Sequence, residues 1–151
     1  MSELILQSLY SGTLVGGVYA LIALGLSLSF GTMRIINLAH GELVLLGAYV
    51  AYAVESRFGV NPLLALPLAM VVVCVFSAVI YFLVARIRRN RELNSLMLTF
   101  ALGMILTNGI LLFWSSDIHS TGSASMQDAV QIGDLYSMFS ELLFFGLSLV
   151  V

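Results

Sequence analysis

The run from Pro62 to Ala85 constrains the fold of this chain more than any other feature. Its 24 residues include no charged side chain, and its only polar side-chain groups belong to Cys74, Ser77 and Tyr81. As a helix it would extend about 36 Å at 1.5 Å per residue, enough to cross the roughly 30 Å hydrocarbon core of a bilayer with some tilt. The run is therefore predicted to be a transmembrane helix.

The composition of the whole chain also indicates a membrane protein. Of its 151 residues, 60% are hydrophobic and 9% are charged, whereas an ordinary soluble domain is about 25% charged. The apolar runs do not alternate with polar residues as the strands of a membrane β-barrel do. The predicted fold class is therefore all-α, a polytopic transmembrane helical bundle. The net charge of −2 gives no indication of a nucleic-acid partner, and the single Cys74 cannot form an intrachain disulfide.

Four full spans and a truncated fifth are predicted. In chain order the predicted segments are 1–54 (the first two spans, with a broken segment near residues 33–42), the external loop 55–61, the third span 62–85, the basic cytoplasmic loop 86–92, the fourth span 93–114, the external loop 115–137 and the partial fifth span 138–151. The fifth would reach only about 21 Å as a helix, which is short of a crossing. Within the second external loop, the sequence QDAVQI could add a short strand or helix.

The distribution of arginine predicts the orientation. Basic residues in short loops stay on the cytoplasmic side. Four of the six arginines fall in the loop between the third and fourth spans, and they are Arg86, Arg88, Arg89 and Arg91. Arg34 then also lies inside, and Arg57 and the N-terminus lie outside. No basic residue precedes the first apolar run, so we expect the first helix to be retained and not cleaved as a signal peptide.

The polar cluster between the first two spans is the first candidate for function. Arg34, Asn37, His40 and Glu42 fall within nine residues, where insertion into a bilayer is costly for charged groups. On a continuous helix Asn37, His40 and Gly41 would share one face. Interfacial anchoring, pathway lining and interhelical hydrogen bonding all remain open for Asn37, His40 and Glu42. A metal site is not predicted, because one His and one Glu do not supply the three or four ligands needed.

Small and polar residues elsewhere predict helix contacts. Gly12 and Gly16 form a GxxxG pair, and glycines of this kind let membrane helices approach closely. Gly41 and Gly47 would leave room for a neighbouring helix or a polar solute. Asn108, in the fourth span, is predicted to seek a hydrogen-bond partner on another helix.

No enzyme signature is present. The chain has no GxxxxGK[ST] phosphate loop, no GxSxG and no HExxH motif. The prediction is therefore a protein that is not an enzyme, with no cofactor and no nucleotide site of its own. If ATP drives its function, another chain must bind the nucleotide.

The run GVYALIALGLSLSFGTMRIINLAHGELVLLGAYVAY (17–52) resembles the first two spans of the inner-membrane permeases of branched-chain amino-acid ABC importers. In that family a YALIALG-type helix, here 19–25, precedes an IN[LF]AHGE[FLV]-type motif, here beginning at Ile36. The basic loop and the segment LMLTFALGMILTNGILLFW that follows it also resemble the family, over 86–114. Family permeases are about twice as long as this chain, and nothing here resembles their ATPase-coupling segment. The chain is therefore interpreted as the N-terminal half of a permease: a fragment, a truncated product or one part of a split permease.

The resemblance implies a multi-pass permease subunit in a bacterial or archaeal cytoplasmic (inner) membrane. Its implied partners are membrane lipid, a second related permease, two cytoplasmic ATPases, a periplasmic or external binding protein and a small amino-acid substrate. Permeases for urea and short amides look alike in this region. Two further alternatives are an ion-coupled secondary transporter subunit, using His40 or Glu42, and a non-transporting membrane fragment.

Overall fold

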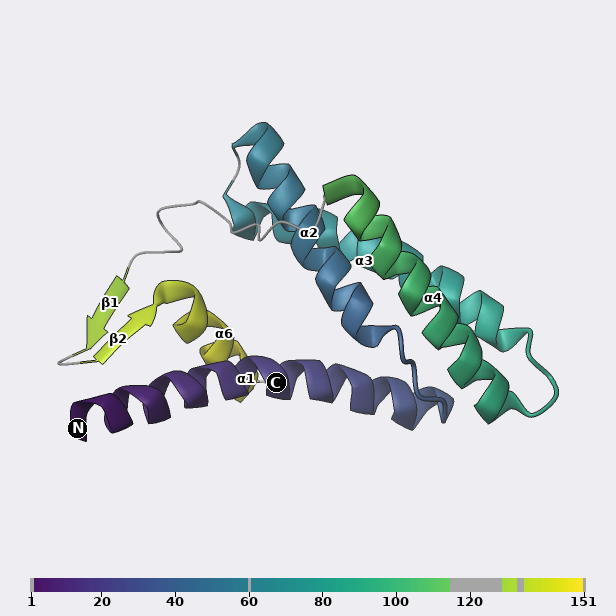
Figure 1. Cartoon of the computed structure of the whole chain (residues 1–151), viewed down its shortest axis with the longest axis horizontal. Coiled ribbons are helices and arrows are strands. Elements are labelled where there is room, and N and C mark those ends of the chain that lie inside the picture. The colour runs from purple at the N-terminus through teal and green to yellow at the C-terminus, as the bar shows by residue number, and fades with distance from the viewer. Residues whose placement is uncertain (1, 60, 115–128, 133–134, 151) are drawn as a thin grey trace. The chain divides into compact units, whose positions relative to one another are not determined.

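The computed structural model describes residues 2–59, 61–114, 129–132 and 135–150. The elements in chain order are α1 (Ser2–Met33), α2 (His40–Phe58), α3 (Pro62–Ala85), α4 (Arg91–Trp114), β1 (Ala129–Ile132), β2 (Leu135–Met138) and α6 (Phe139–Val150) (Figure 1). The predicted all-α membrane fold is confirmed, with one two-stranded hairpin added to it. The chain divides into two compact units, one of residues 1–25 with 122–151 and the other of residues 26–121.

Three of the described helices are long and apolar enough to cross a membrane: Leu4–Met33, Leu63–Ala85 and Arg91–Trp114. In the most apolar 18-residue stretch of each helix, only 11%, 17% and 17% of the residues, respectively, are buried by the rest of the chain. Because apolar surface of that extent is unfavourable in water, the chain is a multi-pass membrane protein. The helix α2 is not among the three, since its 19 residues include Glu42, Glu55 and Arg57.

The larger unit is built from α2, α3 and α4, which pack on one another (Figure 1). The bounds of α3 coincide with the predicted third span, and its start is fixed by local chemistry. The Asn61 side chain accepts a hydrogen bond from the Leu63 N–H at 3.0 Å, and Pro62 occupies the first helical position, where its missing N–H costs nothing. The preceding helix α2 ends at Gly59, whose φ of 63° suits a left-handed helix cap.

The smaller unit combines the first part of α1 with the hairpin and α6. The strands β1 and β2 pair antiparallel, with Ala129 opposite Met138 and Ile132 opposite Leu135. The Tyr10 hydroxyl in α1 lies 3.2 Å from the hydroxyl of Ser137 in β2. A Cβ added at Gly17 would lie 2.7 Å from Cδ2 of Phe145, so α6 approaches the backbone of α1 closely at this point.

The hairpin falls within the stretch predicted as an external loop, 115–137, except for its last residue, Met138. The strand β1 covers part of the QDAVQI sequence, and β2 continues to Met138 before α6 begins. Residues 115–128 and 133–134 of that predicted loop lie outside the described residues. The start of α6 agrees with the predicted start of the fifth span to within one residue.

Candidate functional site

The break between the first two helices is confirmed, and the structure shows how it is made. The helix α1 ends at Met33 because Arg34 adopts a left-handed backbone with φ of 52°, and its N–H bonds to the Phe30 carbonyl at 2.8 Å. A left-handed residue of this kind ends many helices, and the position is usually occupied by glycine. Residues 34–39 are not helical, and α2 begins at His40.

Asn37 lies in this connecting segment and not on the helix. Its side-chain oxygen accepts a hydrogen bond from the Ala39 N–H at 3.1 Å, and its carbonyl accepts one from the His40 N–H at 3.2 Å. The expectation that Asn37, His40 and Gly41 share one helix face is therefore wrong for Asn37. The physical reason is that an asparagine side chain can bond the backbone two residues on, which stabilises a turn in place of a helix.

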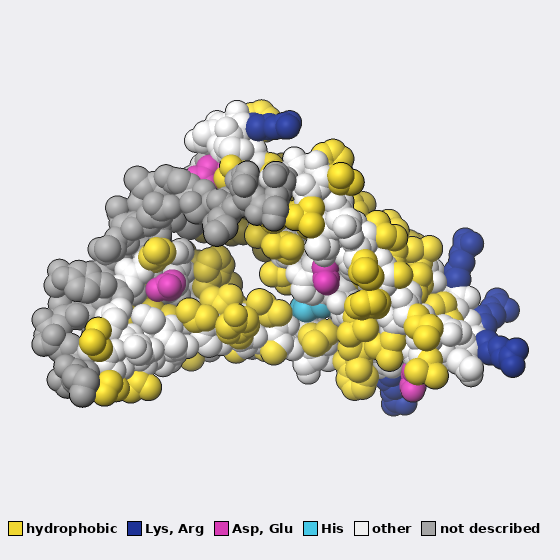
Figure 2. Space-filling view, viewed as in Figure 1, with side chains coloured by type: hydrophobic (Ala, Val, Ile, Leu, Met, Phe, Trp, Pro, Cys, Tyr) yellow, Lys and Arg dark blue, Asp and Glu magenta, His cyan; other side chains and the backbone are white. Residues whose placement is uncertain are grey.

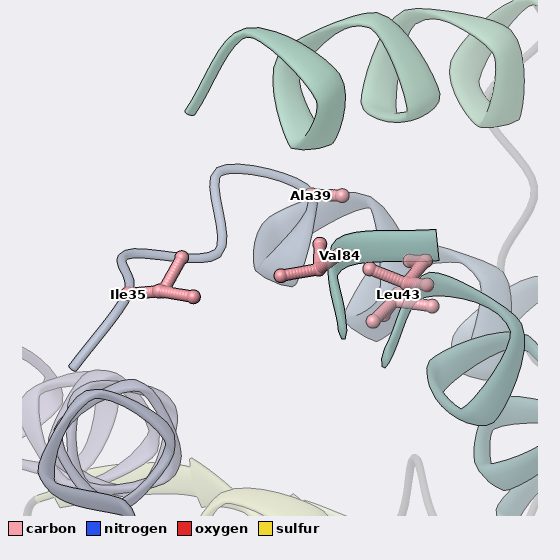
Figure 3. Close-up of a cluster of buried hydrophobic side chains, with 5 residues drawn as sticks. Ile35, Ala39, Leu43 and Val84 are labelled. Atoms are coloured by element: carbon pink, nitrogen blue, oxygen red, sulfur yellow. The ribbon is translucent and has the colours of Figure 1, made fainter. Parts of the chain in front are cut away.

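Apolar contacts hold the connecting segment in place. Five side chains form a buried cluster, and they are Ile35, Ala39, Leu43, Ile80 and Val84. Figure 3 shows Ile35 and Ala39 on the connecting segment, with Val84 of α3 close to Leu43 of α2. Ile35, Ala39 and Leu43 follow one another at intervals of four residues, so the row of buried side chains continues from the break into α2. The polar residues between them are therefore held on a fixed backbone.

The connecting segment is also joined to α4 by a hydrogen bond. The Leu38 N–H donates to the Thr99 hydroxyl oxygen at 3.2 Å. Thr99 is 1% exposed, and its own hydroxyl donates back to the Ser95 carbonyl at 2.9 Å. Backbone N–H groups at the start of a helix have no partner within that helix. The Thr99 hydroxyl supplies a partner for the Leu38 N–H. Ser95, one turn earlier, is 0% exposed, and its hydroxyl has no partner among the described residues.

Glu42 lies against α4 one turn beyond Thr99. A Cβ added at Gly103 would lie 3.3 Å from Cδ of Glu42 and 3.4 Å and 3.5 Å from its two carboxylate oxygens. The half-buried carboxylate of Glu42 therefore packs against the bare backbone at Gly103, and a side chain at position 103 would press against it. Glu42 is also in the first turn of α2, where the helix dipole favours a negative charge.

These contacts define the candidate site, which we call the α2–α4 seam: Leu38, Glu42, Ser95, Thr99 and Gly103. Leu38 meets Thr99 and Glu42 meets Gly103, so α2 and α4 run in the same direction along the seam. Farther along, the ring centroids of Tyr49 in α2 and Trp114 in α4 lie 5.5 Å apart, so the contact between the two helices continues to the end of α4. The seam can hold the two helices in a fixed register and present one carboxylate beside an open backbone.

The remaining predicted site residues are not all brought to the seam. His40 starts α2 and is half-buried, while Asn108 is exposed and donates its side-chain N–H to the Met104 carbonyl of its own helix at 2.7 Å. A Cβ added at Gly12, Gly16 or Gly41 would meet no described atom within 4 Å, whereas one at Gly47 would lie 3.3 Å from a methyl group of Val73 in α3. Of these four glycines, Gly47 alone has a neighbour within that distance in the described part of the chain.

The basic loop residues form a separate cluster. Arg86, Arg88, Arg89 and Arg91 are all exposed at the turn from α3 into α4.

Among the described residues no group of three or more His, Cys, Asp or Glu side chains could hold a metal ion. The seam therefore offers hydrogen bonding, charge and shape, without a metal-ligand cluster in that part of the chain.

Sequence reasoning missed the α4 side of the seam. Neither Thr99 nor Ser95 was among the predicted site residues, and neither was predicted to face the break. The signal was present in the spacing: Ser95, Thr99 and Gly103 are small and recur every four residues. Such a repeat marks a face of a membrane helix that another helix can approach.

Comparison with known proteins places the whole seam inside a matched region. The sequence model of a family described as "Branched-chain amino acid transport system / permease component" matches residues 8–151. No solved structure matches the chain at a significant level.

Three curated relatives carry related names. The high-affinity branched-chain amino acid transport system permease protein BraD of Pseudomonas aeruginosa is 36% identical over 75 residues, covering 50% of this chain and 24% of the relative. The probable branched-chain amino acid transport permease protein LivH of Methanocaldococcus jannaschii is 37% identical over 100 residues, covering 65% and 30%. The high-affinity permease protein LivH of Escherichia coli is 41% identical over 49 residues, covering 32% and 16%. The matched segments thus span less than a third of each relative's own length.

Proposed function

Because the chain belongs to the branched-chain amino acid transport system permease family, we propose that it forms part of the pathway by which an ATP-driven importer carries branched-chain amino acids across the cytoplasmic membrane. The observation that carries this proposal is the match of the family over residues 8–151, which includes the break, α2 and α4. Within the importer this chain would bind no nucleotide and perform no chemistry. Its partners would be a second permease, two cytoplasmic ATPases and an external binding protein.

We assign the break and the seam to solute passage and assembly. Ile35, Ala39 and Leu43 fix the segment on its apolar side, while Asn37, His40 and Glu42 occupy half-buried positions between them. A carboxylate at the start of a helix beside a glycine backbone can attract the ammonium group of an amino acid, and a broken helix is where membrane transporters often place such groups. Asn37 has a further role that is local, since its side chain shapes the turn into α2.

Uptake in the natural host tests the proposal. A strain lacking the gene should lose energy-dependent uptake of labelled leucine, isoleucine and valine, and the restored gene should return it. Unchanged uptake in the deletion strain would refute the assignment. Loss of urea or acetamide uptake, with leucine uptake intact, would favour the short-amide alternative.

The energy source separates the proposal from an ion-coupled transporter. Uptake that stops when ATP is depleted but persists when a protonophore collapses the proton gradient supports the ABC importer. The opposite pattern would point to ion coupling through His40 or Glu42. In restored strains, Asn37→Leu, His40→Ala and Glu42→Gln should lower uptake per inserted protein, while Arg57→Gln, in the last turn of α2, serves as the control.

A further inference from the structure

The turn from α3 into α4 concentrates positive charge. Its four arginines, Arg86, Arg88, Arg89 and Arg91, fall within six residues and are all exposed. No ion pair joins any of them to an acidic side chain within the described residues, although Glu92 follows directly in the chain. Figure 2 shows basic side chains gathered at the end where α3 gives way to α4. The charge is therefore available to an external anion.

Hydrogen bonds brace the backbone of this turn. Asn90 has a left-handed φ of 44°, and the Asn94 side chain donates to the Arg89 carbonyl at 2.8 Å. The Asn94 N–H also bonds to the Asn90 carbonyl at 3.1 Å, which closes the first turn of α4. The arginines thus project from a braced turn, which lowers the entropy lost when they bind a ligand.

The surroundings of the turn are apolar. Phe82 in the last turn of α3 is 67% exposed, and Leu93 and Met97 at the start of α4 are 64% and 72% exposed. An open hollow of about 360 Å³, lined by residues 90–93, lies at the same place. Glu92 is the one acidic residue that lines the hollow, against four exposed arginines in the same turn. A ligand that carries both a negative charge and apolar chains would match the arginines and the exposed apolar side chains together.

We propose that this turn, residues 86–93, is a binding site for the phosphate headgroup of an anionic phospholipid such as phosphatidylglycerol. Guanidinium groups bind phosphate oxygens in a bidentate manner, and clusters of four or more basic residues beside a membrane helix attract anionic lipids. The acyl chains would lie along Phe82, Leu93 and Met97. An acidic protein surface would satisfy the arginines but would leave these side chains uncovered.

Lipid retention by the purified 151-residue chain tests this site. The chain, extracted in mild detergent, is titrated with phosphatidylglycerol or phosphatidylcholine, and bound lipid is counted by native mass spectrometry. The wild-type chain should prefer phosphatidylglycerol. Arg88→Gln with Arg89→Gln should weaken that preference by about fivefold for each arginine lost. Arg57→Gln, an exposed arginine in the last turn of α2, should retain it.

Further arms of the test separate the sources of the anion. Because Arg88 and Arg89 are exposed, circular dichroism of the double variant should match the wild type, and equal helicity shows that the fold is kept. If Arg57→Gln lowers the preference as much as the double variant, the attraction is general and the site is refuted. If millimolar inorganic phosphate displaces phosphatidylglycerol, the turn binds soluble anions and the lipid assignment fails. If the wild type shows no preference between the two lipids, the proposal is also wrong.

Discussion

Two glycines, Gly17 in the smaller unit and Gly103 in the larger, let another element approach a helix backbone, and they receive different kinds of group. A Cβ at Gly17 would lie 2.7 Å from the ring of Phe145, 2.9 Å from the Ser148 hydroxyl and 3.4 Å from the Phe145 Cα, so side chains and backbone of α6 both fill the space. A Cβ at Gly103 would meet only the carboxylate end of Glu42, at 3.3–3.5 Å. The first contact holds two helices together, whereas the second leaves room for a polar group that can move.

The largest expected effect is on the contact at Gly17. Gly17→Ala should lower the free energy of unfolding by about 1–3 kcal/mol relative to Gly16→Ala, because the added methyl group overpacks against the Phe145 ring and the Ser148 hydroxyl. Both substitutions gain the same helix propensity, about 1 kcal/mol, so the difference isolates the contact. Unfolding of the purified chain by increasing sodium dodecyl sulfate in mixed micelles, followed by circular dichroism, measures it. Equal stability of the two variants would show that α6 does not depend on this approach.

The next effect concerns the hydrogen bond across the seam. Thr99→Val keeps the shape of the side chain but removes the acceptor for the Leu38 N–H. Interhelical hydrogen bonds in membrane proteins contribute about 0.6–1.7 kcal/mol, so a loss of about 1 kcal/mol is expected in the same unfolding assay. Thr99→Ser should restore most of it, since the hydroxyl returns. Thr107→Val, in the same helix, is the matched control, because Thr107 has no hydrogen bond to another element among the described residues. An equal loss there would contradict a specific role for Thr99.

The sequence predicted more of the larger unit's helices than of their contacts. The bounds of α3 are marked by Asn61 and Pro62 at one end and by the arginine cluster at the other, and these signals are local. The break was predicted from its polar residues, but the left-handed Arg34 that ends α1 was not, because that conformation usually belongs to glycine. Local chemistry therefore predicts where helices end better than it predicts the backbone that ends them.

The α2–α4 seam could not be predicted from the sequence, because residues far apart in the chain form it. Asn37 and Thr99 both carry polar side chains, yet only the fold brings the segment beside Asn37 to Thr99 across 61 residues of chain. The GxxxG pair of Gly12 and Gly16 drew attention in the sequence, while Gly17, next to it, makes the close contact with α6. A motif identifies a helix that can be approached, but the rotation of that helix decides which glycine is used.

The contact at Gly103 should affect transport more than stability. Gly103→Ala should match Gly109→Ala in the unfolding assay to within about 1 kcal/mol, because the end of a flexible glutamate can move aside. A Cβ at Gly109 meets no described atom within 4 Å, which makes it the control in the same helix. If the carboxylate position matters for passage, Gly103→Ala should lower leucine uptake by the complete transporter several-fold while Gly109→Ala does not. Equal uptake by both would show that the place of the Glu42 carboxylate is irrelevant to transport.

The smallest effect is expected at Ser95, where the seam contains a hydroxyl that is fully buried and has no partner among the described residues. Removing one member of a satisfied pair is costly, but removing an unpaired buried group relieves its desolvation. Ser95→Ala should therefore leave the free energy of unfolding unchanged or raise it by up to about 1 kcal/mol, in contrast to Thr99→Val one turn away. A loss of stability as large as that of Thr99→Val would mean that the Ser95 hydroxyl has a partner in the assembled protein. In that case the seam continues toward the α4 N-terminus, and Ser95→Thr, which keeps the hydroxyl, should be more stable than Ser95→Val, which has the same shape without it.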